Sequence, residues 1–301
     1  MKKTSGILSV LASVVFWGVS FISIKIVLEV VDPILLGFFR YILAVAFVLI
    51  FVWAKRISLK VPFRDLIVFF LAGVIGIFLY TSLENTALQF ISPQSAAIMS
   101  ALVPLAILIA NTLVFKERFE LRYLIYVALS IFGVWLVVSP DATGGTGENA
   151  VLGLVLMVFS IVSWTIYALL TKRVVERYES TKVTALQSIM ALLAFTPALL
   201  FRPFPDFTIF TPTHWFHLLF LGIFCSGVTY LLFVHSIRQL GLTAPNVMLN
   251  FIPLVTVLTG AIWFGESITW IQVLGGVVVV LTMTMITIDR TKSLNATKQP
   301  E

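Results

Sequence analysis

The feature that most constrains this chain is a series of long apolar runs, which recur from Gly6 to Ile288. A helix rises about 1.5 Å per residue, so roughly 20 apolar residues cross the hydrocarbon layer of a bilayer, which is about 30 Å thick. Only 11% of the residues are charged, whereas a soluble domain carries about 25%. The chain is therefore predicted to be an all-α polytopic membrane protein.

Charged and turn-forming residues divide the apolar runs into ten predicted transmembrane helices. The separators include Asp32-Pro33, the glycine-rich segment 141–149 and the proline-rich segment 202–213. The run that follows Met1 is too long for a signal-peptide core, so it is predicted to be the first span. The ten predicted spans are 6–28, 33–54, 66–84, 94–115, 121–138, 151–171, 182–201, 215–236, 243–264 and 270–288.

The basic residues indicate how the chain is oriented, because cytoplasmic loops of membrane proteins are enriched in Lys and Arg. With the N-terminus in the cytoplasm, all but three of the 20 basic residues fall on the cytoplasmic side; the exceptions are Lys25, Arg40 and Arg202. We therefore expect a multi-pass protein of the cell membrane with both termini in the cytoplasm. The net charge of +6 is explained by this topology and not by nucleic-acid binding.

The two halves of the chain resemble each other. Residues 13–29 align with residues 160–176, and residues 102–117 align with residues 251–266. Rare residue types match in order at nearly one offset, which indicates an internal duplication. The matched pairs include Trp17 with Trp164 and Pro104 with Pro253.

Each half contains five predicted spans, an odd number, so the second half must cross the membrane in the opposite direction to the first. Inverted repeats of this kind occur in many secondary transporters, whose two halves enclose a site near the middle of the membrane and open it to each side in turn. The chain is therefore predicted to carry a small solute by alternating access. A duplicated scaffold with only a structural role is the alternative.

Several segments carry a resemblance to a known family: FWG at 16–18, Arg40 in GFFRYILA, the segment that ends at Leu105, and FGE at 264–266. In this order, and duplicated, they resemble the EamA-type permeases of the drug/metabolite transporter superfamily. The resemblance covers roughly residues 6–288 and implies a cytoplasmic-membrane carrier, often an exporter, of amino acids and other metabolites. The expected division is 1–140 as the first EamA-like five-helix repeat, 141–150 as a glycine-rich linker, 151–290 as the second repeat and 291–301 as a cytoplasmic tail.

Two prolines, Pro104 and Pro253, lie in the middles of the fourth and ninth predicted spans. Proline has no amide hydrogen and clashes with the preceding turn, so it bends a helix and frees a carbonyl group. Paired interrupted helices often mark the binding region of a carrier. We predict that both prolines break their helices and take part in gating; simple packing kinks are the alternative.

Two ionisable residues inside or near the spans are candidates for solute binding. Arg40 should face the protein interior, because a guanidinium in lipid is costly, and its repeat mate is Gln187. It is predicted either to bind a substrate carboxylate or to hold helices together. Glu84 is expected at the outer end of the third span, as a partner of Arg40 or the carrier of a coupling proton; a solvated helix end is the alternative.

The remaining candidates are amides, a hydroxyl group and aromatic rings. Asn246 and Asn250, four residues apart, are expected to share a helix face, for solute binding or for hydrogen bonds between helices. Trp17 and Trp164 lie well inside their spans, where each indole N–H needs a partner. The predicted substrate-binding residues are Trp17, Arg40, Tyr80, Glu84, Gln94, Ser95, Trp164, Tyr167, Gln187, Tyr230, Asn246 and Asn250.

No catalytic, metal-binding or cofactor motif accompanies these candidates. The sequence has no HExxH pair and no GxSxG serine, and His214 and His217 have no third ligand beside them. We therefore predict a carrier that is not an enzyme and that needs no cofactor or metal; a channel or an intramembrane enzyme is the alternative function. The predicted partners are a small solute and the lipid bilayer, while a coupling proton and the oligomeric state stay open.

Overall fold

The computed structural model describes residues 2–115, 121–138, 149–264, 269–271, 273–282 and 285. Within them every regular element is helical. Most of the predicted linker, and the whole 291–301 tail, lie outside these residues. In chain order the elements are α1 (Lys2–Val27), α2 (Pro33–Ala54), α3 (Phe63–Leu71), η1 (Ala72–Leu79), α4 (Tyr80–Phe90), α5 (Pro93–Ser100), α6 (Val103–Phe115), α7 (Leu121–Val138), α8 (Ala150–Val175), α9 (Ser180–Phe195), α10 (Ala198–Phe201), η2 (Phe207–Ile209), α11 (Pro212–Leu219), η3 (Phe220–Val228), α12 (Thr229–Leu240), α13 (Thr243–Met248), η4 (Leu249–Phe251) and α14 (Ile252–Phe264).

Seven helical stretches of the described chain are long and apolar enough to cross a membrane. They are Lys3–Val27, Pro33–Ala54, Phe63–Phe90, Ala150–Val175, Ser180–Phe201, Pro212–Leu240 and Thr243–Trp263. Shorter apolar helices at Val103–Val114, Leu124–Leu136 and Val273–Thr282 fall in the fourth, fifth and tenth predicted spans. The protein is thus an all-helical, multi-pass membrane protein, and the count of ten spans stays a prediction.

The outside of the helix bundle is apolar and part of its inside is polar. Trp53 and Ile262, for example, expose 82% and 81% of their surface, whereas Arg40 and Glu84 expose 3% and 6%. Large apolar side chains at such exposure would be unfavourable in water over a wide surface. In a bilayer they lie against lipid, and the charged groups are kept away from it.

Local sequence explains where α2 and α12 begin and end. Asp32 caps α2, because its carboxylate accepts hydrogen bonds from the amides of Ile34 and Leu35, and Pro33 takes the first helical position, where no amide hydrogen is needed. Gly241 ends α12 with a φ angle of 77°. Only glycine adopts that angle without strain, so the chain turns there into α13.

Two membrane helices contain π-helical segments, which are uncommon and often found at functional sites. Segment η1 continues α3 into α4, and segment η3 continues α11 into α12. They lie in the third and eighth predicted spans, which are equivalent in the internal repeat. The sequence analysis did not predict them.

Both prolines stand in the first turn of a helix that follows an interruption. α5 ends at Ser100 and α6 begins at Val103, so Pro104 is the second residue of α6. The 3₁₀ turn η4 separates α13 from α14, and Pro253 is the second residue of α14. A proline in the first turn lacks only an amide hydrogen that would have no helical partner. The helix interruptions therefore precede the prolines, and the gating role stays a prediction.

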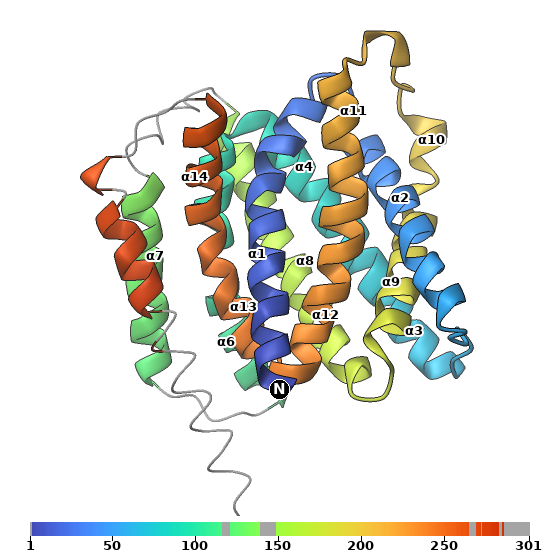
Figure 1. The fold of residues 1–301 in the computed structure, drawn as a ribbon, viewed down its shortest axis with the longest axis horizontal. Helices are drawn as coiled ribbons and strands as arrows, with labels where there is room; N and C mark the ends of the chain where they lie inside the picture. The colour runs from blue at the N-terminus through green and yellow to red at the C-terminus, as the bar shows by residue number, and fades with distance from the viewer. Residues whose placement is uncertain are drawn as a thin grey trace, which may run out of the picture.

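Helices of the first half of the chain pack against helices of the second half, and equivalent contacts occur with the two halves interchanged. α1 packs against α12 and α14 (Figure 1), and α8 packs against α4 and α6. α2 packs against η3 and α9 packs against η1, while α2 and α9 also pack against each other. Buried apolar side chains from the described helices form one large core and two smaller clusters.

The loops meet in two groups at opposite ends of α2. At its start, the guanidinium of Arg202 lies 3.7 Å from the carboxylate of Asp32. Beyond its end, Asp65 accepts from Arg177 at 3.2 Å and from the Tyr178 hydroxyl at 2.5 Å. The hydrogen bond to Asp65 raises the pKa of Tyr178 above its ordinary value. The segment between α2 and the first turn of α3, named loop 55–65, therefore pairs with loop 176–179, and the chain before α2 pairs with the chain after α10.

Candidate functional site

A small internal cavity lies among the helices at the centre of the bundle. Its volume is about 40 Å³, and one water molecule needs roughly 10–15 Å³ measured in this way. The cavity therefore holds about three water molecules as it stands. It is lined by Trp17, Ser20, Phe21, Arg40, Tyr80, Glu84, Ser100, Val103, Met157, Ser160, Ile161, Trp164, Tyr230, Leu249 and Ile252.

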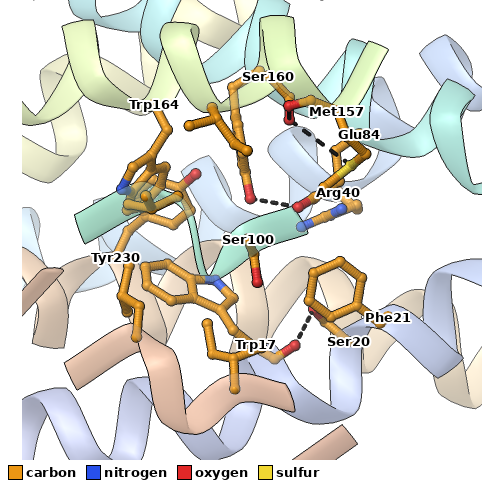
Figure 2. Close-up of a pocket in the computed structure, with 15 residues that line it drawn as sticks. Trp17, Ser20, Phe21, Arg40, Glu84, Ser100, Met157, Ser160, Trp164 and Tyr230 are labelled. Atoms are coloured by element: carbon orange, nitrogen blue, oxygen red, sulfur yellow. Dashed lines mark hydrogen bonds between the residues drawn. The ribbon is translucent and has the colours of Figure 1, made fainter. Parts of the chain in front are cut away.

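One side of the cavity is a wall of aromatic rings (Figure 2). The rings of Trp17 and Trp164 meet edge to face, with centroids 5.2 Å apart. Tyr230 lies 5.6 Å from Trp17, again edge to face, and Tyr80 lies 5.1 Å from Trp164. Edge-to-face contacts of this kind stabilise aromatic pairs by about 0.5–1.5 kcal/mol beyond the burial of their surface. The wall therefore has a defined shape.

The indole N–H groups of the two tryptophans bond to the protein and not to the cavity. Trp17 Nε1 donates to the carbonyl oxygen of Cys225 at 3.1 Å. That carbonyl belongs to η3. Trp164 Nε1 donates to Asn246 Oδ1 at 3.0 Å. Each tryptophan thus has the partner that the sequence analysis required, and its ring faces are left for apolar contacts.

Arg40 brings a positive charge to the opposite side of the cavity, where Figure 2 also places Glu84. Its Nε donates to Ser226 Oγ at 3.1 Å, and its Nη1 donates to Asn85 Oδ1 at 3.3 Å. Asn85 is itself held by a 2.9 Å bond from its Nδ2 to the carbonyl of Pro33. These neutral partners fix the guanidinium but do not neutralise it, so its charge remains available to an anionic group.

Glu84 does not lie at a helix end as expected, because α4 continues to Phe90. Its carboxylate is 6% exposed and accepts a hydrogen bond of 2.5 Å from the Tyr80 hydroxyl. Glu84 and Arg40 line the same cavity. No ion pair within 4.0 Å joins them among the described residues. The cavity thus presents a guanidinium group and a carboxyl group that are not joined by an ion pair.

Six of the twelve predicted residues line the cavity, and Tyr167 and Asn246 stand directly behind it. The ring of Tyr167 lies 5.1 Å from that of Trp164. Asn246, which accepts from Trp164, also donates to the carbonyl of Leu242 at 2.8 Å. The six lining residues are Trp17, Arg40, Tyr80, Glu84, Trp164 and Tyr230.

The other four predicted residues do not line this cavity. Gln187 donates to Thr171 on α8 at 2.9 Å. Asn250 donates to Ser130 on α7 at 2.7 Å. It does not share the direction of Asn246, because α13 ends at Met248 and Asn250 lies in the 3₁₀ turn η4, which has fewer residues per turn. Ser95 bonds to Ser92 at the start of α5, close to Gln94.

The sequence analysis missed the small and apolar residues of the cavity, and also Asn85 and Ser226. Asn85 follows Glu84 in a polar run, Thr81–Thr86, within an apolar span, and that run is a usable signal. Ser226 has no such signal, since it lies in an otherwise ordinary apolar segment and meets Arg40 only through packing of η3 on α2.

Comparison with known proteins gives a family, two relatives and a structure of similar fold. A model of the EamA-like transporter family matches residues 4–139 and again residues 151–288. A curated protein of Archaeoglobus fulgidus, described as an uncharacterized transporter, is 25% identical over 268 residues, which cover 89% of this chain and 92% of the relative. The uncharacterized transporter YyaM of Bacillus subtilis is 24% identical over 284 residues, which cover 93% of each chain. A solved crystal structure has a similar fold, with a TM-score of 0.78 at 18% identity over 96% of this chain and 98% of that chain.

Proposed function

Because the chain belongs to the EamA-like transporter family, within the drug/metabolite transporter superfamily, we propose that it exports a small metabolite, such as an amino acid, by alternating access around the central cavity. The observation that carries this proposal is the cavity itself. A guanidinium without an ion-pair partner and a carboxyl group line one side of the cavity, and aromatic rings line the other. A solute with a carboxylate, an amino group and an apolar part matches these three kinds of surface.

The size of the cavity supports a cycle in which the protein moves. As described above, it holds about three water molecules, and an amino acid needs considerably more room. The lining residues come from α1, α2 and α4 to α6 in one half and from α8, α12, η4 and α14 in the other. Movement of one half against the other therefore enlarges the cavity and opens it to one side at a time.

The pairing of loops supports two inverted five-helix repeats, 1–140 and 151–290, and hence ten spans. By the alignment of the two halves, loop 55–65 is equivalent to the segment that follows Arg202. These two equivalent segments lie at opposite ends of α2, the first next to Arg177 and the second next to Asp32. A head-to-tail arrangement of the halves requires this. The helix contacts agree with this arrangement, because equivalent helices of the two halves make equivalent contacts.

The basic loops support an orientation with both termini in the cytoplasm, in the cell membrane. Loop 55–65 and segment 172–182 contain eight of the basic residues and meet at one end of the bundle. Cytoplasmic loops attract such residues. The start of α1 lies at the same end as the end of α12, since Ser5 Oγ is 2.8 Å from His235 Nε2.

Transport into liposomes tests the proposal. Purified protein should accumulate at least one amino acid from a labelled panel, and lack of transport of every member would refute the substrate class. Arg40→Gln should raise the apparent KM roughly ten- to hundredfold, because hydrogen bonds to a charged group contribute about 1.5–3 kcal/mol. Arg202→Gln, which makes the same change at an exposed ion pair, should leave KM unaltered. An unchanged KM in Arg40→Gln would remove Arg40 as the carboxylate anchor.

We extend the proposal to proton coupling through Glu84. The carboxyl group is buried in the cavity and bonded to Tyr80, so it can exchange a proton with the solvent only when the cavity opens. An imposed pH gradient should therefore alter the rate in the native protein and have no effect in Glu84→Gln. A gradient effect of equal size in both proteins would show that coupling, if present, uses another group.

A further inference from the structure

One face of α9 is polar, although the helix lies within the membrane-spanning bundle. Ser180, Thr184, Gln187 and Ser188 follow one another at helical spacing, and each exposes 9% or less of its surface. Such a spacing places side chains on one stripe of a helix. The stripe faces the neighbouring helices, since α9 packs on α2, η1, α3 and α12.

Four polar atoms of this stripe have no hydrogen-bond partner among the described residues. The hydroxyl groups of Ser180, Thr184 and Ser188 and the Oε1 of Gln187 make no hydrogen bond there. Several other buried hydroxyls bond to the carbonyl four residues earlier, as Thr165 does with Ile161 at 2.8 Å, whereas those of Ser82 and Thr229 also make no hydrogen bond within the described chain. Unpaired buried polar groups cost about 1–3 kcal/mol each, so a run of four on one face calls for a functional explanation.

At Gln187 the stripe is connected to the cavity. Gln187 Nε2 donates to Thr171 on α8 at 2.9 Å. One turn earlier on α8 stands Tyr167, which is fully buried. The ring of Tyr167 lies 5.7 Å from that of Tyr230, which lines the cavity. A file of polar groups thus connects the cavity to the middle of α9.

At Ser180 the stripe approaches the end of the bundle where loop 55–65 meets segment 172–182. Ser180 is the first residue of α9. Two residues later, Lys182 Nζ donates to the carbonyl of Lys60 at 2.7 Å. Just before α9, Arg177 bonds to Asp65. These contacts tie segment 172–182 to loop 55–65 at the end of the bundle where α9 begins.

We infer that the polar face of α9 is the closed half of the solute pathway, leading from the cavity to the end of the bundle where loop 55–65 meets segment 172–182. The inference rests on the proposed transport function and assigns it one route. When the halves separate, water enters along α9 and pairs with the hydroxyl groups of Thr184 and Ser188. In the closed arrangement the loop contacts at Lys60 and Asp65 cover its mouth.

Cysteine accessibility tests the route. In a Cys225→Ala background, Thr184→Cys and Ser188→Cys are reconstituted in liposomes and treated with a charged methanethiosulfonate that does not cross the bilayer. A thiol reacts as its thiolate, which forms only where water is present. Ala185→Cys is the matched control, because Ala185 is equally buried at the same depth but packs against Val48 and Val52. Lys60→Cys marks the side of the membrane on which loop 55–65 lies.

Thr184→Cys and Ser188→Cys should react at least tenfold faster than Ala185→Cys, and only from the side that labels Lys60→Cys. Equal rates at all three positions, or reaction from the opposite side, would overturn the route. Solute flux is measured separately in the same vesicles. If flux is present but the two stripe cysteines do not react, the route is refuted and the proposed function is not. Absence of flux refutes the proposed function.

Thr184→Val gives a second measurement that does not depend on labelling. Valine has the volume of threonine without its hydroxyl, and an apolar isostere at a site with no hydrogen bond is neutral or stabilising. The variant should therefore unfold at the same or a higher temperature than the native protein and yet transport several-fold more slowly. A lower unfolding temperature with unchanged flux would assign Thr184 a purely structural role and contradict the route.

Discussion

The close approach of η1 to α8 leads to a quantitative prediction for Gly76→Ala. A Cβ at position 76 would lie 2.4 Å from the Cβ of Tyr167 and 2.8 Å from its Cα. Carbon atoms pack best at about 3.5–4.0 Å, so the two helices must separate by roughly 1 Å or more. Because the obstacle includes backbone, rotation of the Tyr167 side chain cannot relieve it.

Overpacking of this kind costs about 1–3 kcal/mol, and the better helix propensity of alanine returns at most about 1 kcal/mol. We expect a net loss of about 1–2 kcal/mol, measured as a fall of several degrees in the thermal unfolding temperature of the purified protein in detergent. Transport should also slow, because Tyr167 supports Trp164 in the cavity wall.

Gly276→Ala is the matched control for this change. There the nearest atom to an added Cβ is Leu254 Cδ1 at 3.1 Å, the end of a flexible side chain. That side chain can move, so Gly276→Ala should be neutral or slightly stabilising. If Gly76→Ala were as stable as Gly276→Ala, the close packing of η1 on α8 would be refuted.

Three further predictions concern a hydrogen bond, a loop contact and the lipid-facing surface. Trp164→Phe should lower the stability by about 1–3 kcal/mol in thermal unfolding, because it leaves the buried Asn246 Oδ1 unpaired; equal stability would contradict that bond. The raised pKa of Tyr178 means that its bond to Asp65 contributes stability below the ordinary tyrosine pKa and loses it as the pH rises through the raised value. Tyr178→Phe should therefore flatten the alkaline limb of the unfolding temperature against pH, and an unaltered limb would exclude Tyr178 as its source. Val162→Arg, on the outer face of α8, should reduce the amount of protein inserted in membranes, since a central arginine costs about 2.5–3.5 kcal/mol; normal insertion would argue against lipid contact there.

The sequence predicted the membrane class, because apolar runs of sufficient length follow directly from the thickness of a bilayer. It also predicted family membership and both boundaries of α2, which begins and ends where the apolar run does. Prolines and charged residues mark such ends locally, and a local signal needs no knowledge of the partner helices.

Several of the candidate residues line one cavity in the structure, and their role in solute binding stays a proposal. Trp17, Arg40 and Glu84 attracted notice because tryptophan and charged residues are uncommon inside apolar spans. Glu84 was placed at a helix end, because the mixed polarity after Tyr80 hides the continuation of the helix to Phe90.

Tertiary structure alone decided which polar groups meet and which stay apart. Arg40 bonds to Ser226, 186 positions away in the chain. Asn246 and Asn250 bond to different helices, because Asn250 lies in a 3₁₀ turn that follows the helix of Asn246. The π-helical form of η1 likewise arises where Gly76 lets the helix approach Tyr167. A sequence fixes the length and polarity of each helix through its contact with lipid and water, but the register of one helix against another depends on side chains from both, and only the packed structure brings these together.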